Sequence, residues 1–346
     1  MTHFEIPALN EPAMAAARVR HDQLTKPRGS LGRLEDVGVQ LAGITGKCPP
    51  PIPLRKAVLV FAGDHGVAAH GVSIAPSDVT RQMVFNFVSG GAAINVIARR
   101  AGARVTVVDA GVMTELPALR HLVRGKVGPG TADISKGPAM TLAQAQSAVA
   151  LGALCVETEM ECGLDLLACG EMGIGNTTPA TALVSVLTGC PPRGITGPGT
   201  GISGEALTRK ITLIEAALAV NKPDPADGLA LLAKVGGYEI AAMTGAMLRA
   251  ATLRVPVMVD GFIATAAAMV AVVINPAVKG YLIAGHRSAE PAHDLALGWL
   301  GLKPLLDLGM RLGEGTGAVL AMALVESSAA VLQDMATFAE AGVKVD

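Results

Sequence analysis

The chain has 346 residues, enough for one large α/β domain or two smaller ones, and a formal net charge of −1. Hydrophobic residues make up 51% of it and aromatic residues only 3%, so we expect a core of Ala, Val, Leu, Ile and Met, with 41 glycines for turns and close approaches. The charge is near zero and basic residues form no stripe with interleaved aromatics, which argues against nucleic acid as the main partner and favours a small ligand.

Targeting signals and cysteines point to a cytoplasmic protein. The N-terminal stretch MTHFEIPALNEP has neither the basic region nor the apolar region of a secretion signal. Residues 261–274 form the most membrane-like stretch, but it is too short to span a bilayer, so we predict a core helix and no membrane partner. The cysteines include no C-x-x-C pair and are expected to be reduced core residues: Cys48, Cys155, Cys162, Cys169 and Cys190.

The predicted elements begin with two helices, at 12–26 and 31–42, joined by the loop that opens KPRGSLGRLE. After CPPPIP at 48–53, short β-branched runs alternate with alanine-rich segments that have helical spacing. We expect strands at 57–61, 104–108, 164–169, 255–259 and 281–284. We expect helices at 79–100, 142–161, 205–220, 229–251 and about 317–341, with NKPDPADG at 221–228 linking two of them.

Strands that alternate with helices predict an α/β protein with a doubly wound, mainly parallel sheet and helices on both faces. In such sheets ligands bind beyond the carboxyl ends of the strands, where the polar loops of this chain fall, so the loops are expected to converge on one site. We predict a large α/β domain at 48–316, with 1–47 and 317–346 forming a small helical domain packed on it.

The stretch GEMGIGNTTPA at 170–180 follows the predicted strand at 164–169. It is predicted to be a strand tip, a polar loop and a helix start, with Thr178 as N-cap and Pro179 at the first helical position. The free N–H groups of that helix start attract anions, phosphate especially. Glu171 lies beside this cradle and is therefore expected to contact a cationic or hydroxyl-bearing part of the ligand.

The stretch GTGISG at 199–204 matches G-x-G-x-x-G, but the turn-rich CPPRGITGP precedes it instead of a strand, so the dinucleotide fingerprint fails. The loop opens the predicted helix at Glu205. It is either a second anion cradle, with Lys210 one or two turns on, or an ordinary flexible connection, and the sequence leaves both open.

Two further motifs carry ionisable groups. In GHRSAEPAH, the residues His286, Glu290 and His293 have the i, i+4, i+7 spacing of metal ligands on one helix face, but Pro291 weakens this and structural histidines are the stronger expectation. Asp64 and His65 in GDHGV are either ligand contacts or loop caps. In RLGEGTGA, Glu314 lies between glycines before a helix, so it is either a capping carboxylate or a partly desolvated general base.

Together, KPRGSLGRLE, GDHGV, GEMGIGNTTPATA, TGPGTGI, VDGFIATAAA, GHRSAEPAH and LGEGTGA closely resemble the nicotinate-nucleotide:dimethylbenzimidazole phosphoribosyltransferases of cobalamin biosynthesis, over roughly residues 20–345. The resemblance implies transfer of the 5-phosphoribosyl group of nicotinate mononucleotide to 5,6-dimethylbenzimidazole. Inversion at C1′ gives α-ribazole 5′-phosphate and nicotinate. It also implies a Rossmann-like sheet with a small helical domain and a homodimer. We expect no cofactor and no metal.

The resemblance makes Glu314 the general base and places Glu171 near the ribose or the developing oxocarbenium charge. The phosphate and ribose are assigned to Gly173, Gly175, Asn176, Thr177, Gly199, Thr200, Gly201 and Lys210. Candidates for the benzimidazole pocket, which should be flat and apolar, are Gln82, Met83 and Met172. Arg28 supplies either charge or a subunit contact. The alternatives are a phosphoribosyltransferase or nucleosidase that uses another base, a noncatalytic nucleotide-binding sensor, and a metal-dependent hydrolase built on His286, Glu290 and His293.

Overall fold

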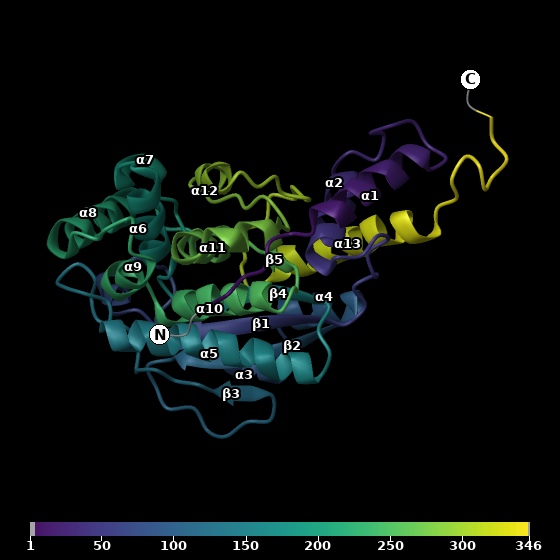
Figure 1. Ribbon diagram of the computed structural model, residues 1–346. Coiled ribbons are helices and arrows are strands. Elements are labelled where there is room, and N and C mark those ends of the chain that lie inside the picture. Colours follow the sequence, from purple (N-terminus) through teal and green to yellow (C-terminus); the bar gives the residue numbers. More distant parts are fainter. Residues whose placement is uncertain (1–3, 345–346) are drawn as a thin grey trace.

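A six-stranded sheet forms the centre of the computed structural model, which describes residues 4–344 (Figure 1). Its order is β3-β2-β1-β4-β5-β6, and every neighbouring pair is parallel. The strands are β1 (Lys56–Gly63), β2 (Ala103–Gly111), β3 (Leu122–Arg124), β4 (Leu166–Met172), β5 (Val257–Val259) and β6 (Leu282–Ala284). The predicted fold class is confirmed, although β3 was not predicted. The strand order reverses between β1 and β4, the switch point at which doubly wound sheets bind ligands.

Both faces of the sheet are covered by helices. Strand β1 is buried along its whole length, and its side chains alternate between two cores. Leu59 and Phe61 belong to one core, with α5 (Leu142–Glu161), α10 (Tyr238–Thr252) and α11 (Phe262–Ile274). Val58 and Val60 belong to the other, with α3 (Asp78–Val88), α4 (Ala93–Ala101) and α13 (Thr316–Asp334). This two-sided burial explains why the strands are continuous apolar runs.

The remaining helices gather at opposite ends of the molecule, as Figure 1 shows. At one end α1 (Glu11–Gln23) and α2 (Arg33–Thr45) pack on α13, and at the other lie α6 (Thr177–Thr188), α7 (Pro192–Ile195), α8 (Gly204–Asn221) and α9 (Gly228–Val235). Helix α12 (His293–Leu300) lies beside α11, and the short 3₁₀ helices are η1 (Gly66–His70) and η2 (Pro276–Tyr281). Because α13 also packs on α4 and β4, it joins the helical end to the sheet, and the domain boundary at 316/317 stays a prediction.

Two segments predicted as single helices are broken by glycines. The 79–100 segment is α3 and α4, separated where Gly90 has a φ of +80°. The 229–251 segment is α9 and α10, separated at Gly236-Gly237, and a Cβ on Gly237 would lie 2.5 Å from Cε1 of His65. The last helix ends at Asp334 instead of about residue 341. Tertiary contacts at these glycines therefore override the local helical spacing.

Two other features concern apolar residues. The expectation that all the cysteines lie in the core is wrong: Cys155 and Cys169 are buried, Cys48 and Cys190 are half-buried, and Cys162, at the C-cap of α5, is exposed.

The predicted core helix at 261–274 is confirmed as α11. Among the helices of residues 4–344, α13 is long and apolar enough to cross a membrane, but 56% of that window is buried inside the protein, as in a core helix.

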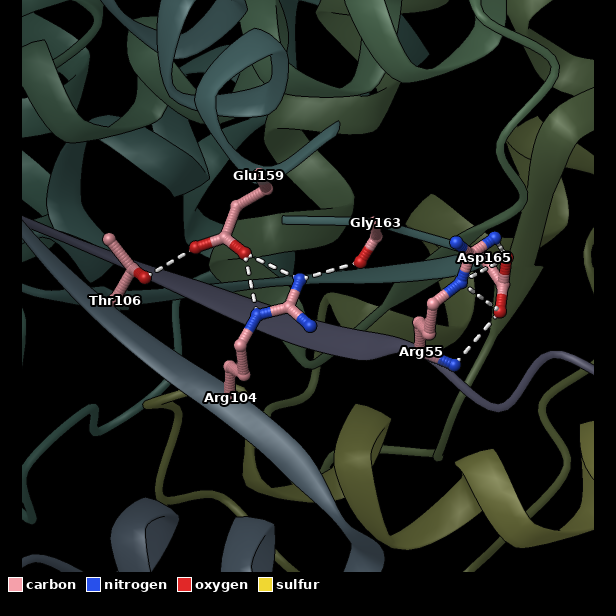
Figure 2. Close-up of polar contacts among 6 residues, drawn as sticks. All are labelled: Arg55, Arg104, Thr106, Glu159, Gly163 and Asp165. Atoms are coloured by element: carbon pink, nitrogen blue, oxygen red, sulfur yellow. Dashed lines mark hydrogen bonds and ion pairs between the residues drawn. The ribbon is translucent and has the colours of Figure 1, made fainter. Parts of the chain in front are cut away.

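Ion pairs anchor the amino ends of the strands, away from the polar loops (Figure 2). Arg104 of β2 donates to Glu159 of α5 at 2.8 Å and to the carbonyl of Gly163 at 2.8 Å, while Thr106 donates to Glu159 at 2.5 Å. Arg55 pairs with Asp165 at 2.6 Å, just before β1 and β4. These contacts tie the end of α5 to the amino ends of the strands. In such folds ligands bind at the opposite, carboxyl ends.

Close packing of α5 on α10 gives a stability prediction. A Cβ on Gly152 would lie 1.8 Å from the carbonyl oxygen of Ala242, whereas one on Gly298 in α12 would meet nothing within 4 Å. We expect Gly152→Ala to lower the free energy of unfolding by about 3 kcal/mol, because the helices must separate. Gly298→Ala is the matched control. It should raise the free energy of unfolding by about 0.5–1 kcal/mol through helix propensity alone. Chemical denaturation of both variants measures this, and a Gly152→Ala protein as stable as the wild type would contradict it.

Candidate functional site

A cavity of about 350 Å³ lies at the carboxyl ends of β4, β5 and β6. Segments far apart in the chain line it: residues 171–174 with 176–177, residues 199–200, residues 261–264, three residues of 286–290, residues 311–314, and Met83 of α3. The loops after β4, β5 and β6 therefore converge as expected. The loops after β1 and β2 do not line the cavity, and His65 lies behind Gly173, where a Cβ would be 3.3 Å from Nε2 of His65.

Most of the predicted site residues line this cavity. They are Glu171, Met172, Gly173, Asn176, Thr177, Gly199, Thr200, Glu314 and Met83. Four others do not: Gly175, Gly201, Lys210 and Gln82. Gln82 is held elsewhere, since its amide donates to the Asp78 carboxylate at 2.7 Å on the exposed side of α3. The lining also includes residues that sequence reasoning did not single out, notably Phe262, Ser288, Arg311 and Leu312.

Glu171 lies inside β4, where a strand tip followed by a loop was predicted. The residue is 7% exposed, and its carboxylate accepts a hydrogen bond from the Asn176 amide. Burial raises its pKa to about 8, and the nearby carboxylates of Asp260, Glu239 and Glu314 add to the shift. Glu171 is therefore mostly protonated at neutral pH in the unliganded protein.

Helix α6 begins at Thr177, one residue before the predicted N-cap, so the assignment of Thr178 as N-cap is wrong. Asn176 occupies the N-cap position, but its side chain donates to Glu171 and does not cap the helix. The start of α6 therefore has no side-chain cap at the cavity wall. The Thr178 N–H already donates to the Gly175 carbonyl at 2.9 Å and Pro179 has no N–H, so the Thr177 N–H and the positive end of the dipole are what this helix start offers to an anion.

Lys210 stands behind this wall and is completely buried. Its ammonium donates to Oγ1 of Thr177 at 2.7 Å and to the carbonyl of Gly197 at 3.1 Å. Burial lowers its pKa to about 8, and the carboxylate of Glu290 opposes that shift. On the cavity side, Arg311 donates to the carbonyl of Gly199 at 3.0 Å. Two cations thus hold the 197–200 loop in place.

Glu314 has the most unusual backbone of the site. Its φ is +62°, between Gly313 at +84° and Gly315 at +88°, a run of left-handed residues just before α13. For a residue with a side chain this costs roughly 1–2 kcal/mol. The residue is 5% exposed, and its carboxylate accepts a hydrogen bond from the Ile94 N–H at 3.1 Å. Burial, with a contribution from Asp260, raises its pKa above the usual glutamate value. Strain of this kind clusters at functional sites.

The histidines of GHRSAEPAH do not form a metal site. Helix α12 begins at His293, so His286 and Glu290 precede it and the three side chains do not share a helix face. Nδ1 of His293 accepts from the Ser288 N–H at 2.7 Å and Nε2 lies 2.9 Å from Oγ1 of Thr265, while burial lowers its pKa to about 4. Within residues 4–344 no group of three His, Cys, Asp or Glu side chains is placed to hold a metal ion.

Behind the cavity, a buried pair supports the loop after β4. Nε2 of His65 lies 2.8 Å from Oε1 of Glu239, and a Cβ on Gly173 would lie 3.3 Å from that nitrogen. Burial lowers the pKa of His65, but the Glu239 carboxylate outweighs this and the pKa lies above its ordinary value. His65 thus supports the loop after β4 through Glu239, and its side chain does not cap the helix η1 that it precedes.

This parallel α/β fold places an uncapped helix start and a strained, buried glutamate at one cavity, an arrangement that suits an enzyme acting on a phosphorylated small molecule. Accordingly, a phosphoribosyltransferase family model matches residues 6–343. A nicotinate-nucleotide–dimethylbenzimidazole phosphoribosyltransferase of Roseiflexus sp. (strain RS-1) is 55% identical over 99% of this chain and 97% of the relative. The protein of that name from Desulforudis audaxviator is 54% identical, over 97% of this chain and 95% of the relative.

Solved structures agree. The crystal structure of this enzyme from Thermus thermophilus superimposes with a TM-score of 0.93 at 46% identity, covering 98% of this chain and all of that one. A structure of CobT from the same organism gives 0.94 at 48%, covering 97% of this chain and 100% of that one. The chain belongs to the nicotinate-nucleotide–dimethylbenzimidazole phosphoribosyltransferase family.

Proposed function

We propose that this chain transfers the 5-phosphoribosyl group of nicotinate mononucleotide to 5,6-dimethylbenzimidazole, forming α-ribazole 5′-phosphate and nicotinate for the lower ligand of cobalamin. Relatives that carry this activity in their names are 54–55% identical over at least 97% of the chain. The observation that carries the proposal is Glu314, a buried carboxylate in a strained turn that lines a cavity large enough for small ligands.

One general base suffices for this chemistry. Glu314 takes the N–H proton of the benzimidazole while the other ring nitrogen forms a bond to C1′ on the face opposite nicotinate. The C1′–N bond to nicotinate breaks, and its electron pair returns to the pyridinium nitrogen, so the leaving group needs no general acid. Glycosidases differ, because their leaving oxygen requires a second carboxyl group. Burial raises the pKa of Glu314, which strengthens its carboxylate as a base.

The other cavity residues bind different parts of the two substrates, according to whether their groups are cationic, acidic or apolar. The start of α6 at Thr177 and the loop at 199–200 bind the 5′-phosphate, with Lys210 supplying positive charge through Thr177. Glu171 lies on the ribose side, where it hydrogen-bonds a hydroxyl or faces the developing oxocarbenium charge. The benzimidazole contacts the apolar side chains of Met83 and Met172. We propose a cytoplasmic homodimer that acts on these two small molecules and on no nucleic acid.

The direct test incubates the purified protein with nicotinate mononucleotide and 5,6-dimethylbenzimidazole in the presence of a chelator. We expect α-ribazole 5′-phosphate and nicotinate to form in equal amounts, and neither to form when the benzimidazole is omitted. Chromatography with mass detection measures both products. Folded protein that binds the nucleotide but forms no product would overturn the proposal and favour a sensor. Nicotinate release without the benzimidazole would instead indicate a nucleosidase.

A further inference from the structure

Asp260 follows β5 directly and is 2% exposed. It does not line the cavity. Its Oδ2 accepts a hydrogen bond from the Gly315 N–H at 3.2 Å, and its Oδ1 accepts one from the Ala318 N–H at 2.8 Å. Both donors belong to the start of α13, and Gly315 is the residue directly after Glu314. A carboxylate 55 residues away in the sequence therefore binds the turn that carries the proposed base.

The turn needs such a partner. Helix α13 has glycine at its N-cap, which offers no side chain to bind the free N–H groups of the first turn. Glu314 is also the one residue of the left-handed run 313–315 that has a side chain. Its carbonyl is pressed against β4, where a Cβ on Gly170 would lie 2.3 Å from that oxygen. Asp260 thus supplies the cap and holds the strained backbone between β4 and α13.

No charged side chain reaches Asp260 within hydrogen-bond distance among residues 4–344. Within residues 4–344, the cation-forming group that faces it is the His286 ring, whose Nε2 lies 3.6 Å from Oδ1, beyond hydrogen-bond distance. From β4 it faces the Cys169 thiol and the Glu171 carboxyl, and from the turn the Glu314 carboxylate. The hydrogen bonds of Asp260 are therefore to backbone N–H groups, those of Gly315 and Ala318 at the start of α13 and that of the adjacent Gly261, and its carboxylate lies at the positive end of α13.

We propose that Asp260 is a positioning residue, which acts on the reaction through Glu314 by holding the 313–316 turn, and which does not touch substrate. This inference rests on the proposed function, in which Glu314 is the base. The motif VDGFIATAAA contains Asp260 but assigns it no role, so the positioning role is a new inference. If the Glu314 carboxylate moves by a fraction of an ångström, it no longer has the hydrogen-bond geometry to take the benzimidazole N–H proton. The proposed nucleotide subsite at 176–200 is unaffected by this movement.

The test is Asp260→Asn, which keeps the volume but loses one of the two acceptor oxygens. We expect kcat to fall on the order of 10²-fold, because the base is misplaced. The dissociation constant of nicotinate mononucleotide should stay within a factor of about 2 of wild type, because uniform binding is untouched. Asp109→Asn is the matched control: Asp109 is also buried in a strand end and accepts a backbone N–H, from Val112 at 2.8 Å, but does not bind the 313–316 turn. It should leave kcat nearly unchanged.

A double-mutant cycle with Glu314→Gln separates positioning from a general structural effect. If Asp260 acts through Glu314, adding Asp260→Asn to Glu314→Gln should lower the residual rate by less than about 3-fold. Equal fold-losses in both backgrounds would overturn the inference. If Glu314→Gln itself kept full activity, the proposed base would fail instead, which is a different result. In the wild-type protein, the N–H groups of Gly315 and Ala318 should exchange hydrogen as slowly as the middle of α13, and fast exchange would overturn the inference even if Asp260→Asn did not fold.

Discussion

A Glu314→Gln variant is expected to lose about 10²–10⁴-fold in kcat, the range that a positioned general base contributes. Glutamine keeps the shape of the side chain and an oxygen to accept the Ile94 N–H, but it cannot take the benzimidazole proton. Because Glu314 belongs to the turn before α13 and not to the start of α6, binding of nicotinate mononucleotide should persist. Steady-state rates together with nucleotide titration measure both quantities. A variant with wild-type turnover would contradict the assignment.

The pH dependence adds a second readout to the same experiment. The base works only when it is ionised, so the wild-type rate should fall with decreasing pH through a pKa above the ordinary glutamate value of about 4.3. This limb should be missing from the residual rate of Glu314→Gln. Glu205→Gln is the control, since Glu205 lies exposed in the first turn of α8 and should keep both the rate and the limb.

Glu171→Gln is expected to change how stability depends on pH. The folded-state pKa of Glu171 is about 8, raised by burial, against an ordinary value near 4.3. Between these values the folded protein holds a proton that the unfolded chain has released, so wild-type stability falls as pH rises. The slope from this one group is at most about 1.4 kcal/mol per pH unit. Glutamine does not titrate, so the variant should lack this loss.

The comparison is cleanest between pH 6.5 and 8, in the unliganded protein. His293, with a pKa of about 4, and Lys210, with a pKa of about 8, add slopes of the opposite sign below and above this window, respectively. His65 contributes equally to both proteins, so it cancels in the difference. Denaturant titrations at several pH values measure the two curves. Parallel curves for wild type and Glu171→Gln would show that Glu171 is already ionised in the folded protein.

Sequence reasoning found most of the cavity wall because the strand tips carry distinctive motifs. Glu171, Asn176, Thr177 and Glu314 line the cavity as expected. It assigned Lys210 to the phosphate but not the side from which its ammonium acts, which is behind the wall through Thr177, because helical spacing does not say on which side of a loop a long side chain ends. It also placed Gln82 in the base pocket, although that amide is held by Asp78 one helical turn away.

The sequence by itself determined the fold class, the order of most strands and helices, and the family. These follow from local periodicity and from motifs, and both are properties of short stretches of chain. Only the tertiary structure decided where helices break, as at Gly237 beside His65, and that the glutamate at 314 adopts a left-handed conformation. The same holds for the contact from Asp260 to the start of α13. Such features depend on groups brought together from distant parts of the chain, and no local pattern encodes them.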